Sequence, residues 1–434
     1  MSKQKRIILD LATAQFDGYT CAQMRAHYNF PAHLDGSGQT IGLAEWGSGY
    51  SQNDLDGFCK DQGLPPITPE YIVIDGGQNT PDAECTLDIE VAHGMAPGAK
   101  IRVYEAPAGP NYQTFWDQVI AVLTYISNEP NPPSVLSISY GDAESDWSAA
   151  QVQAADALIE KIVGRGCTVL VASGDQGALG MHDVYADPQG TPNADAPATC
   201  PHAVAIGGTC VPLNGAPERA WNVSGYGATG GGFSTVFPRP SYQDAVNQNA
   251  MRGEPDFSML ADPQTGWRIC FNGQVVVIGG TSAASPAAAA LIACVDQERA
   301  NQGLGPVGDI LPTIYAHEEV FTPITIGNNS FMGAQGYAAQ KPWSACCGIG
   351  VPDATKFVAL FVPSVAPAKP NPSTEPVYVE GAQQSFSALL QDGMAYVPAV
   401  LAGKALGWNA TRNAKGVYFT KPATPSLWQR IFGG

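Results

Sequence analysis

Ser282 stands in a sequence context that could make its hydroxyl a nucleophile. Residues 278–287 read IGGTSAASPA, so a polar turn separates the apolar run at 275–278 from an alanine-rich stretch at 287–295. This pattern predicts a strand, a tight turn and a buried helix. Because backbone N–H groups and the helix dipole favour negative charge at a helix N-terminus, a serine placed there is a candidate nucleophile for acyl transfer.

Two carboxylates are the candidates for taking the proton from that serine. The segment 82–92 reads DAECTLDIEVA, and its acids Glu84 and Asp88 are four residues apart, so they share one face of a helix. Two close carboxylates tend to share a proton, with one pKa raised, so Glu84 could act as a general base oriented by Asp88. The alternative is a solvated acidic face, which the interleaved apolar residues of a core-facing helix argue against.

Asp175 follows another apolar run, in the segment VLVASGDQG at 169–177. An ionised carboxylate cannot donate a hydrogen bond to an oxyanion, but a protonated carboxylic acid can. The position would therefore stabilise an oxyanion only at low pH or with a raised pKa. The simpler interpretation is a loop aspartate that caps a helix.

Short apolar runs alternate with helical patterns over the first 300 residues or so. Strands that alternate with helices of this length indicate right-handed βαβ units and a mostly parallel sheet covered on both faces. We therefore predict a three-layer α/β fold with its catalytic residues at the carboxyl ends of strands. The predicted strands are 41–46, 101–106, 135–140, 167–173 and 203–207, and the predicted helices are 84–93, 114–127 and 149–163.

The chain is expected to contain two domains. Residues 363–376 (PSVAPAKPNPSTEP) are proline-rich without periodicity, which predicts a semi-rigid linker. It would join a domain at 1–362 to a small α+β module at 377–434. The module's pattern resembles the stalk-type domains of copper amine oxidases and many surface proteins, and the alternative is a C-terminal packing extension. Within it we expect strands at 377–379 and 416–419 and a helix at 398–406.

Composition and charge exclude several classes of protein. The chain has 434 residues and a net charge of −17, which argues against a nucleic-acid partner. The acidity is explained either by solubility or by work in acid, where carboxylates are neutralised. No apolar run is long enough to span a bilayer, and the start, MSKQKRIILD, is not a signal peptide.

The ten cysteines are scattered and form no CxxC pair, so a zinc site is not expected. Cys167 lies in an apolar run and Cys294 in the alanine-rich helix, and we expect both to be buried thiols. Cys200 and Cys210 could form a disulfide, but the sequence leaves their pairing open.

The turn at Ser282 resembles the nucleophile turn of the subtilisin clan. Members that use a Ser-His-Asp triad carry a His-Gly-Thr motif, which is missing here; His93, at the expected end of a helix, is the nearest contender for a rival Ser-His-Asp peptidase. With carboxylates in place of both the histidine and the oxyanion asparagine, residues 15–362 resemble the sedolisins, the serine-carboxyl peptidases. Further matching segments are AEWG at 44–47, SISYG at 137–141, ATGGGFS at 228–234, GEPD at 253–256 and GGTS at 279–282.

The resemblance implies a subtilisin-like fold and an acid-acting endopeptidase that works through an acyl-enzyme. It implies an extracellular location, and we expect a monomer that acts on proteins or peptides. The implied site residues are Ser282 as nucleophile, Glu84 as general base and acid, Asp88 as its partner, Asp175 as oxyanion stabiliser, Glu45 as an outer carboxylate, Tyr140 where relatives often have Trp, and Ser139, Gly141, Gly230 and Gly231 as substrate-binding residues.

The chain departs from the family pattern in two respects. Sedolisins usually bind calcium through an aspartate after a Val-Phe-x sequence and another in a Gly-x-Gly-Trp-Asp-Pro loop. Here these positions carry Pro323, Gln340, Pro342 and Ser344, so without the carboxylates we predict no calcium and no other cofactor. We also expect that the family's inhibitory prosegment is missing, because the catalytic-type sequence begins within the first twenty residues. These losses lend some weight to the alternative of a non-catalytic scaffold or surface-attachment protein, but a decayed enzyme would have little reason to keep Glu84, Asp88, Asp175 and Ser282 together.

Overall fold

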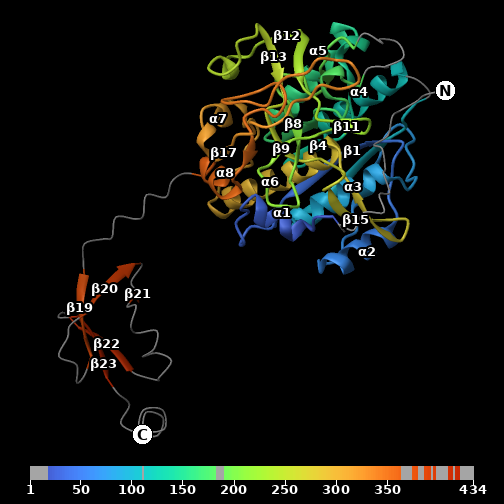
Figure 1. Cartoon of the computed structure of the whole chain (residues 1–434). Coiled ribbons are helices and arrows are strands. Elements are labelled where there is room, and N and C mark those ends of the chain that lie inside the picture. Colours follow the sequence, from blue (N-terminus) through green and yellow to red (C-terminus); the bar gives the residue numbers. More distant parts are fainter. Residues whose placement is uncertain are drawn as a thin grey trace. The chain divides into compact units, whose positions relative to one another are not determined.

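The computed structural model describes residues 18–109, 112–181 and 190–362, together with the backbone of five C-terminal strands. Two compact units divide the chain at Val362 and Pro363 (Figure 1). The first ten residues, most of the predicted linker and the predicted helix at 398–406 lie outside the described residues.

A twisted parallel sheet forms the centre of the first unit. Its strands follow the order β14-β8-β6-β4-β1-β3-β2, every pair along this path is parallel, and a short antiparallel strand, β9, pairs with β8. The strands are β1 (Thr40–Trp46), β2 (Glu70–Val73), β3 (Lys100–Ala106), β4 (Val135–Ile138), β6 (Thr168–Ala172), β8 (Val204–Cys210), β9 (Arg219–Ala220) and β14 (Phe257–Leu260).

Helices cover both faces of this sheet (Figure 1). On one face α3 (Ala83–Met95) and α6 (Thr281–Asn301) pack against each other and the strands, while α4 (Tyr112–Asn128) and α5 (Ala149–Val163) cover the other face. The first sixteen residues of α6 are all buried and rich in alanine, which lets this helix lie close to the sheet. The predicted three-layer α/β fold with a mostly parallel sheet is confirmed.

Smaller elements complete the first unit. The helices are α1 (Cys21–His27), α2 (Gln52–Gln62), α7 (Leu311–Tyr315) and α8 (Ala354–Leu360). The short strand pairs are β5 (Asp142–Ala143) with β7 (Asp195–Ala196), β10 (Asn222–Val223) with β11 (Gly227–Ala228), β12 (Gly232–Pro238) with β13 (Met251–Glu254), β15 (Trp267–Phe271) with β16 (Gln274–Ile278), and β17 (Phe321–Thr322) with β18 (Val351–Pro352). Four single 3₁₀ turns, η1 (Glu144–Asp146), η2 (Gly177–Leu179), η3 (Ser241–Gln243) and η4 (Glu318–Val320), lie in the connections of the described part.

The elements predicted from apolar periodicity are present with small shifts at their ends. Helix α5 has the predicted bounds, and its start is fixed by a capping box in which Ser148 and Gln151 bond reciprocally. Strand β4 ends at Ile138, two residues before the predicted end, so Ser139 and Tyr140 follow the strand at its carboxyl edge. The Ser139 side chain reaches Asp88 on α3, while the Tyr140 ring packs against Trp46 and Phe115.

The C-terminal unit contains a five-stranded sheet in the order β21-β20-β19-β23-β22. Strand β19 begins at Thr374, which is three residues inside the segment predicted as a linker. The strands are β19 (Thr374–Val379), β20 (Phe386–Gln391), β21 (Met394–Tyr396), β22 (Asn409–Asn413) and β23 (Gly416–Thr420).

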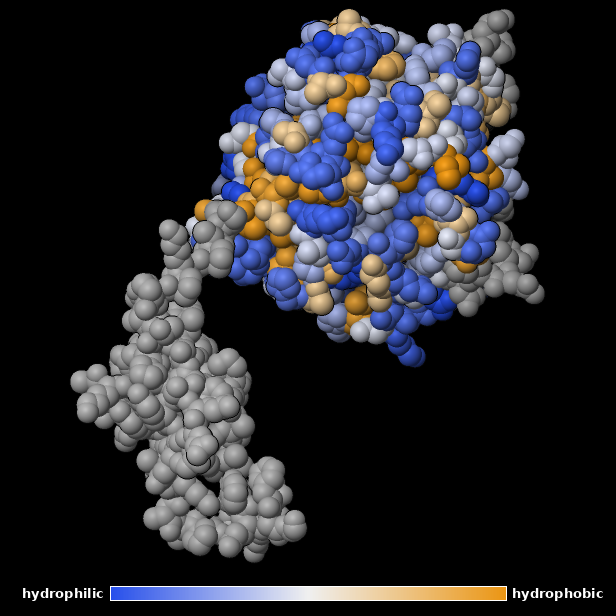
Figure 2. All heavy atoms as spheres, turned by 60° about the vertical axis from the view of Figure 1, so that its left-hand side comes forward, coloured by the Kyte–Doolittle hydropathy of each residue, from blue (hydrophilic) through white to orange (hydrophobic). Residues whose placement is uncertain are grey.

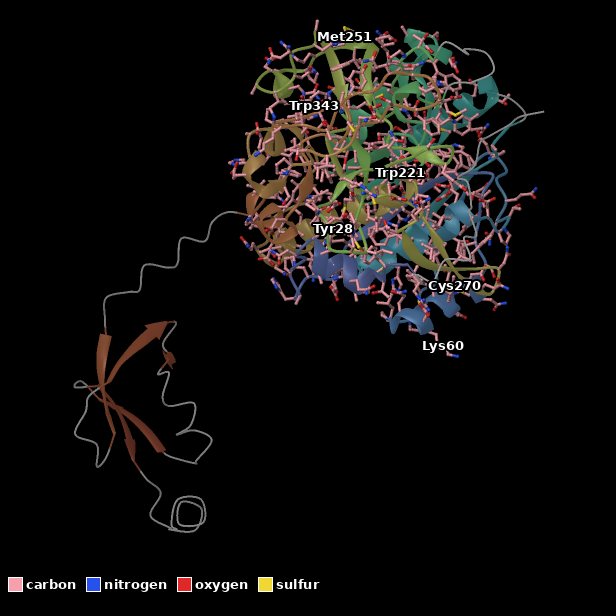
Figure 3. The ribbon with its side chains drawn as sticks, in the orientation of Figure 1. Tyr28, Lys60, Trp221, Met251, Cys270 and Trp343 are labelled. Carbon is pink, nitrogen blue, oxygen red and sulfur yellow. The ribbon has the colours of Figure 1, made fainter. Side chains whose placement is uncertain are left out.

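All ten cysteines are buried free thiols. Cys167 and Cys294 are buried, as predicted, and Cys200 and Cys210 do not form the disulfide that the sequence left open. Cys270 on β15 lies at the same end of the unit as α2, which carries Lys60 (Figure 3).

The face of the molecule drawn in Figure 2 is mainly hydrophilic, and apolar residues form small groups between the hydrophilic ones. Among the residues that the structure describes, none of the helices combines the length and the apolar character needed to cross a bilayer.

Candidate active site

Ser282 lies at the start of α6, directly after the turn that leaves β16. Gly280 is the N-cap residue of this helix and has a φ of 108°, a left-handed conformation that favours glycine. The Ser282 side chain is 5% exposed, and its Oγ donates to the main-chain oxygen of Ser139 at 3.4 Å. The predicted strand, turn and helix thus hold the hydroxyl at a helix N-terminus, where backbone N–H groups have no intrahelical acceptor.

Glu84 occupies the first turn of α3, whose N-cap Asp82 accepts a hydrogen bond from the backbone N–H of Glu84 at 3.0 Å. Burial and the nearby Asp88 raise the pKa of Glu84 well above its usual value, and a hydrogen bond from Ser282 opposes that rise. The structure therefore brings the predicted nucleophile and the predicted general base together, at the N-termini of two helices that pack against each other.

Asp88 continues the acidic chain one helical turn further along α3. It is completely buried, and burial raises its pKa to about 8, against the opposing effect of hydrogen bonds from Ser139 and Glu45. The Ser139 hydroxyl donates to Asp88 Oδ2 at 2.6 Å. Because Asp88 and Glu45 are both carboxyl groups, a hydrogen bond between them requires that one of the two carries a proton.

Glu45 and Tyr140 form the outer end of this chain. Glu45 precedes the last residue of β1 and is completely buried, and the Tyr140 hydroxyl donates to its Oε2 at 3.0 Å. Burial, together with the charges of Asp88 and Glu84, raises the pKa of Glu45 well above its usual value. The fold therefore brings Glu45 and Tyr140, the two outer residues named from the sequence, together beside Asp88.

Asp175 lies on the other side of the nucleophile turn, after the carboxyl end of β6. Its Oδ1 accepts hydrogen bonds from the Thr281 backbone N–H at 2.7 Å and from the Thr281 hydroxyl at 2.8 Å. Burial raises the pKa of Asp175, and the two bonds from Thr281 counter that rise. A β-carbon on Gly280 would come within 2.8 Å of Asp175 Oδ2, so the glycine leaves room for this carboxyl beside Ser282.

The glycines predicted to bind substrate pack against main chain. A β-carbon on Gly230 would lie 1.8 Å from the Ser173 oxygen, and one on Gly231 would lie 2.6 Å from the Ala345 oxygen. Gly230 N–H also donates to the Gly174 oxygen at 2.7 Å. These contacts give Gly230 a part in holding the turn that leads to Asp175, while the substrate-binding role stays a prediction.

Gly141 lies at the edge of the site, where a β-carbon would come within 3.0 Å of the Ala196 oxygen. It directly follows Ser139 and Tyr140, and it leads into the short strand β5. Its role in substrate binding likewise stays a prediction.

His93 does not belong to the site. It lies in the last turn of α3, nine residues beyond Glu84, which is about 13 Å along a helix. Its side chain is 2% exposed and its Nε2 bonds the main-chain oxygen of Pro65 at 2.8 Å. Burial lowers its pKa, so the imidazole has a structural partner and no contact with Ser282, which argues against a Ser-His-Asp arrangement.

The loop predicted to have lost calcium is held by other contacts. Ser344 exchanges backbone hydrogen bonds with Gly348 at 3.1 and 2.9 Å, and its Oγ accepts the Cys347 N–H at 3.1 Å. Pro323 follows β17 and offers no side-chain oxygen. In the part of the chain that the structure describes, no three His, Cys, Asp or Glu side chains gather to hold a metal. The residues present do not fit a calcium site, and calcium independence stays a prediction.

Two hydroxyl groups bond the carboxyls: sequence reasoning missed the one on Thr281 and named Ser139 only as a substrate-binding residue, a role that stays a prediction. The Ser139 side chain bonds Asp88 and the Thr281 side chain bonds Asp175. Thr281 precedes the candidate nucleophile and carried a signal, because a threonine in the first turn of a helix is a ready donor. No sequence signal paired the Ser139 hydroxyl with Asp88, since the two residues are 51 positions apart.

Comparison with known proteins agrees with this fold and site. The model of the family described as the subtilase family matches residues 72–310, more than half of the chain. The chain therefore belongs to the subtilase family.

Individual relatives narrow the family further. The chain is 38% identical over 375 residues to kumamolisin of a Bacillus species, a match that spans 81% of this chain and 65% of kumamolisin. It is 34% identical to tripeptidyl-peptidase sed1 of Aspergillus fumigatus, over 75% of this chain and 62% of that protein. The solved Pseudomonas sedolisin, a serine-carboxyl proteinase complexed with pseudo-iodotyrostatin, is 27% identical with a TM-score of 0.68, over 79% of this chain and 97% of that one.

These matches confirm the predicted resemblance to the sedolisins and the subtilisin-like fold. The chain spans just under two thirds of the length of the curated relatives it matches, 65% of kumamolisin and 62% of the Aspergillus protein.

Proposed function

We propose that this protein is an acid-acting serine-carboxyl endopeptidase. The observation that carries the proposal is the position of the Ser282 hydroxyl within hydrogen-bonding reach of a buried carboxyl, Glu84, whose neighbour Asp88 has a pKa raised to about 8 by burial. A hydroxyl beside a carboxylate base at a helix N-terminus has the parts that nucleophilic catalysis needs.

In the proposed reaction, Glu84 takes the proton of Ser282 as the serine oxygen attacks the scissile carbonyl. The tetrahedral oxyanion is stabilised by the Ser282 backbone N–H and by a proton on Asp175. Glu84 then gives its proton to the leaving amine, which departs and leaves the acyl-enzyme. Water, deprotonated by Glu84, attacks the ester, and the returning proton restores the Ser282 hydroxyl.

The pH dependence follows from the proton on Asp175. Burial raises the pKa of this carboxyl, which extends the pH range in which it can donate a hydrogen bond. Activity should therefore fall as Asp175 ionises with rising pH, while loss of the proton from Glu84, which the base needs, sets the acid limb of the profile.

Cleavage of an unfolded protein substrate from pH 3 to 7 tests the proposal, with Ser282→Ala as control. We expect cleavage in acid that disappears in the variant. Equal cleavage by Ser282→Ala, or a maximum at neutral or alkaline pH from the same site, contradicts the proposal. No cleavage at any pH favours the non-catalytic scaffold.

Several relatives are named tripeptidyl-peptidases, which makes removal of N-terminal tripeptides a second candidate activity. Two peptides of the same sequence, one with a free and one with an acetylated N-terminus, separate the candidates. An endopeptidase cleaves both at the same internal bonds. A tripeptidyl-peptidase releases a tripeptide from the free peptide and leaves the acetylated one intact.

A further inference from the structure

The Ser139 hydroxyl lies between two components of the proposed site. Its Oγ is 2.6 Å from Asp88 Oδ2 and 3.2 Å from the main-chain oxygen of Ser282. In return, the main-chain oxygen of Ser139 accepts from Ser282 Oγ at 3.4 Å. A single residue that follows β4 thus contacts the partner of the general base, the nucleophile's hydroxyl and the nucleophile's peptide group.

The main-chain oxygen of Ser282 has a specific need for this donor. In an α-helix it would accept the N–H of the residue four positions later, but that residue is Pro286, which has no N–H. Ser282 is only 5% exposed, so water is a poor substitute for the missing N–H donor. Among the described residues, the Ser139 hydroxyl is a side-chain donor within hydrogen-bond distance of this oxygen.

A serine hydroxyl carries one proton, so it can donate to only one of these two acceptors at a time. The distance of 2.6 Å to Asp88 is typical of a hydroxyl bonded to an ionised carboxylate. When Asp88 carries a proton instead, that proton can be donated to Ser139 Oγ, and the serine hydrogen is released to turn towards the Ser282 oxygen.

We propose that Ser139 is a positioning residue whose hydroxyl donates to Asp88 when that carboxyl is ionised and to the Ser282 main-chain oxygen when Asp88 is protonated. This inference rests on the proposed function. No proton leaves Ser139; its O–H bond rotates between two acceptors. The protonation state of Asp88 thereby determines whether the main-chain oxygen of Ser282 receives a hydrogen bond from Ser139.

Other ionisable groups also face Asp88, and none of those that influence it is a cation. Removing the hydroxyl would take away a donor that favours the Asp88 anion, so the carboxyl pair should lose its first proton at a higher pH. The ionisable groups that act on this carboxyl and its partners are Asp82, Glu84 and Cys85 at the start of α3, Glu45 on β1, Tyr140 after β4 and Asp175 after β6.

Ser139→Ala, Ser139→Thr and Ser137→Ala form a matched set. Ser137 Oγ bonds Ser285 Oγ at 2.7 Å, joining the same strand to the same helix without contacting a catalytic-type carboxyl. In the pH profile of kcat/KM, we expect the acid limb of Ser139→Ala to move up by about one pH unit. Its kcat should fall about tenfold with KM within about twofold. Ser139→Thr should restore the parental limb, and Ser137→Ala should keep it.

An unchanged acid limb in Ser139→Ala, or an equal shift in Ser137→Ala, overturns the inference. Infrared titration of the Asp88 carboxyl, assigned by difference from Asp88→Asn, tests it without turnover. Ser139→Ala should titrate Asp88 about one pH unit higher, and an unaltered titration refutes the inference. Failure of the proposed function is distinguishable, because it would leave the parent protein inactive while the infrared result still decides the role of Ser139.

Discussion

Asp256 and Asp88 are both completely buried, yet their surroundings differ in almost every respect. Asp256 accepts from the Arg252 guanidinium at 2.8 Å, from the Tyr315 hydroxyl at 2.7 Å and from the Ala205 N–H at 2.7 Å. Arg252 is also fully buried, so each charge has its counter-charge. Burial raises the pKa of Asp256, and Arg252 is the largest influence that lowers it.

The carboxyls at the proposed site have no such cation. Among the described residues, Asp88 Oδ1 and Glu45 Oε1 receive no N–H or hydroxyl donor, and the influences on Glu84 are mostly further acids. These groups lower the cost of burial by keeping protons rather than by pairing with a base.

The difference separates a structural role from a functional one. A buried ion pair with all its oxygens bonded holds segments in place, whereas a cluster of acids without a cation keeps exchangeable protons at a cost in stability. Each of the following changes breaks or sharpens that distinction.

The largest expected effect comes from Glu84→Gln, which keeps the shape of the side chain but removes the proposed base. We expect kcat/KM to fall about 10³-fold, or about 4 kcal/mol in transition-state free energy, with no loss of thermal stability. Glu90→Gln is the matched control, because Glu90 lies on the same helix, is buried, and accepts the Cys270 N–H. Turnover in the control should stay within about twofold; an equal loss in both variants would remove any special role for Glu84.

Asp256→Asn tests the structural half of the comparison. It leaves the Arg252 charge buried without its partner, which should lower the free energy of unfolding by about 3 kcal/mol or more. Urea denaturation measures the change. Asp244→Asn is the control, because Asp244 pairs with Arg239 while its side chain is 60% exposed, and its loss should cost less than about 1 kcal/mol. Similar costs for the two variants would show that the buried pair is not special.

The proton on Asp88 should make stability fall as pH rises. Its pKa is raised from 3.8 to about 8 in the folded protein. Between these values the folded state binds more protons than the unfolded state. The stabilisation is therefore fully present below about pH 4 and is lost as pH rises through about 8.

Asp88→Asn should reduce the loss of unfolding free energy between pH 4 and 8 by on the order of 5 kcal/mol. Chemical denaturation at each pH measures it. Asp61→Asn is the control, because a hydrogen bond from Arg268 lowers the pKa of Asp61, away from this window. A parental slope in Asp88→Asn would mean that Asp88 does not retain its proton in the folded state.

The smallest effect is expected for Tyr140→Phe. It removes the hydroxyl bond to Glu45 but keeps the ring, which packs edge-on against Trp46 at 5.1 Å between centroids. We expect kcat/KM to fall about fivefold, close to 1 kcal/mol. Tyr104→Phe, which removes a bond to Glu129, should leave turnover unchanged. An unchanged kcat/KM in Tyr140→Phe would mean that the hydroxyl of Tyr140 does not support the carboxyl chain and that this chain ends at Glu45.

Much of the fold was predictable because the buried strands and helices of the first unit are long and apolar. The periodicity of apolar residues predicted β1, β3, β6, β8 and α5. The acids Glu84, Asp88 and Asp175, together with Ser282, indicated the candidate site. Short elements such as β2 carry too few residues for a pattern, and β4 ends at Ile138, two residues before the predicted end. The start of α1 could have been found, since Thr20 and Gln23 form a capping box.

The parts of the site that sequence could not supply are long-range. Asp88 on α3 and Ser139 after β4 meet although they are 51 residues apart, and spacing along the chain does not reveal which hydroxyl reaches which carboxyl. The packing of Gly230 against the Ser173 oxygen is another case, because it depends on two loops brought together by the sheet.

The reactivity of the ten buried thiols can report where the folded protein opens. Because all ten are reduced and shielded, a thiol reagent can label a cysteine only where the surrounding structure has opened. Cys270 would report on the region of α2 and β15, and Cys347 on the loop that holds Ser344. Mass spectrometry during incubation at increasing pH would give the order in which the thiols are labelled. That order would reveal which segment of the folded chain unfolds locally first.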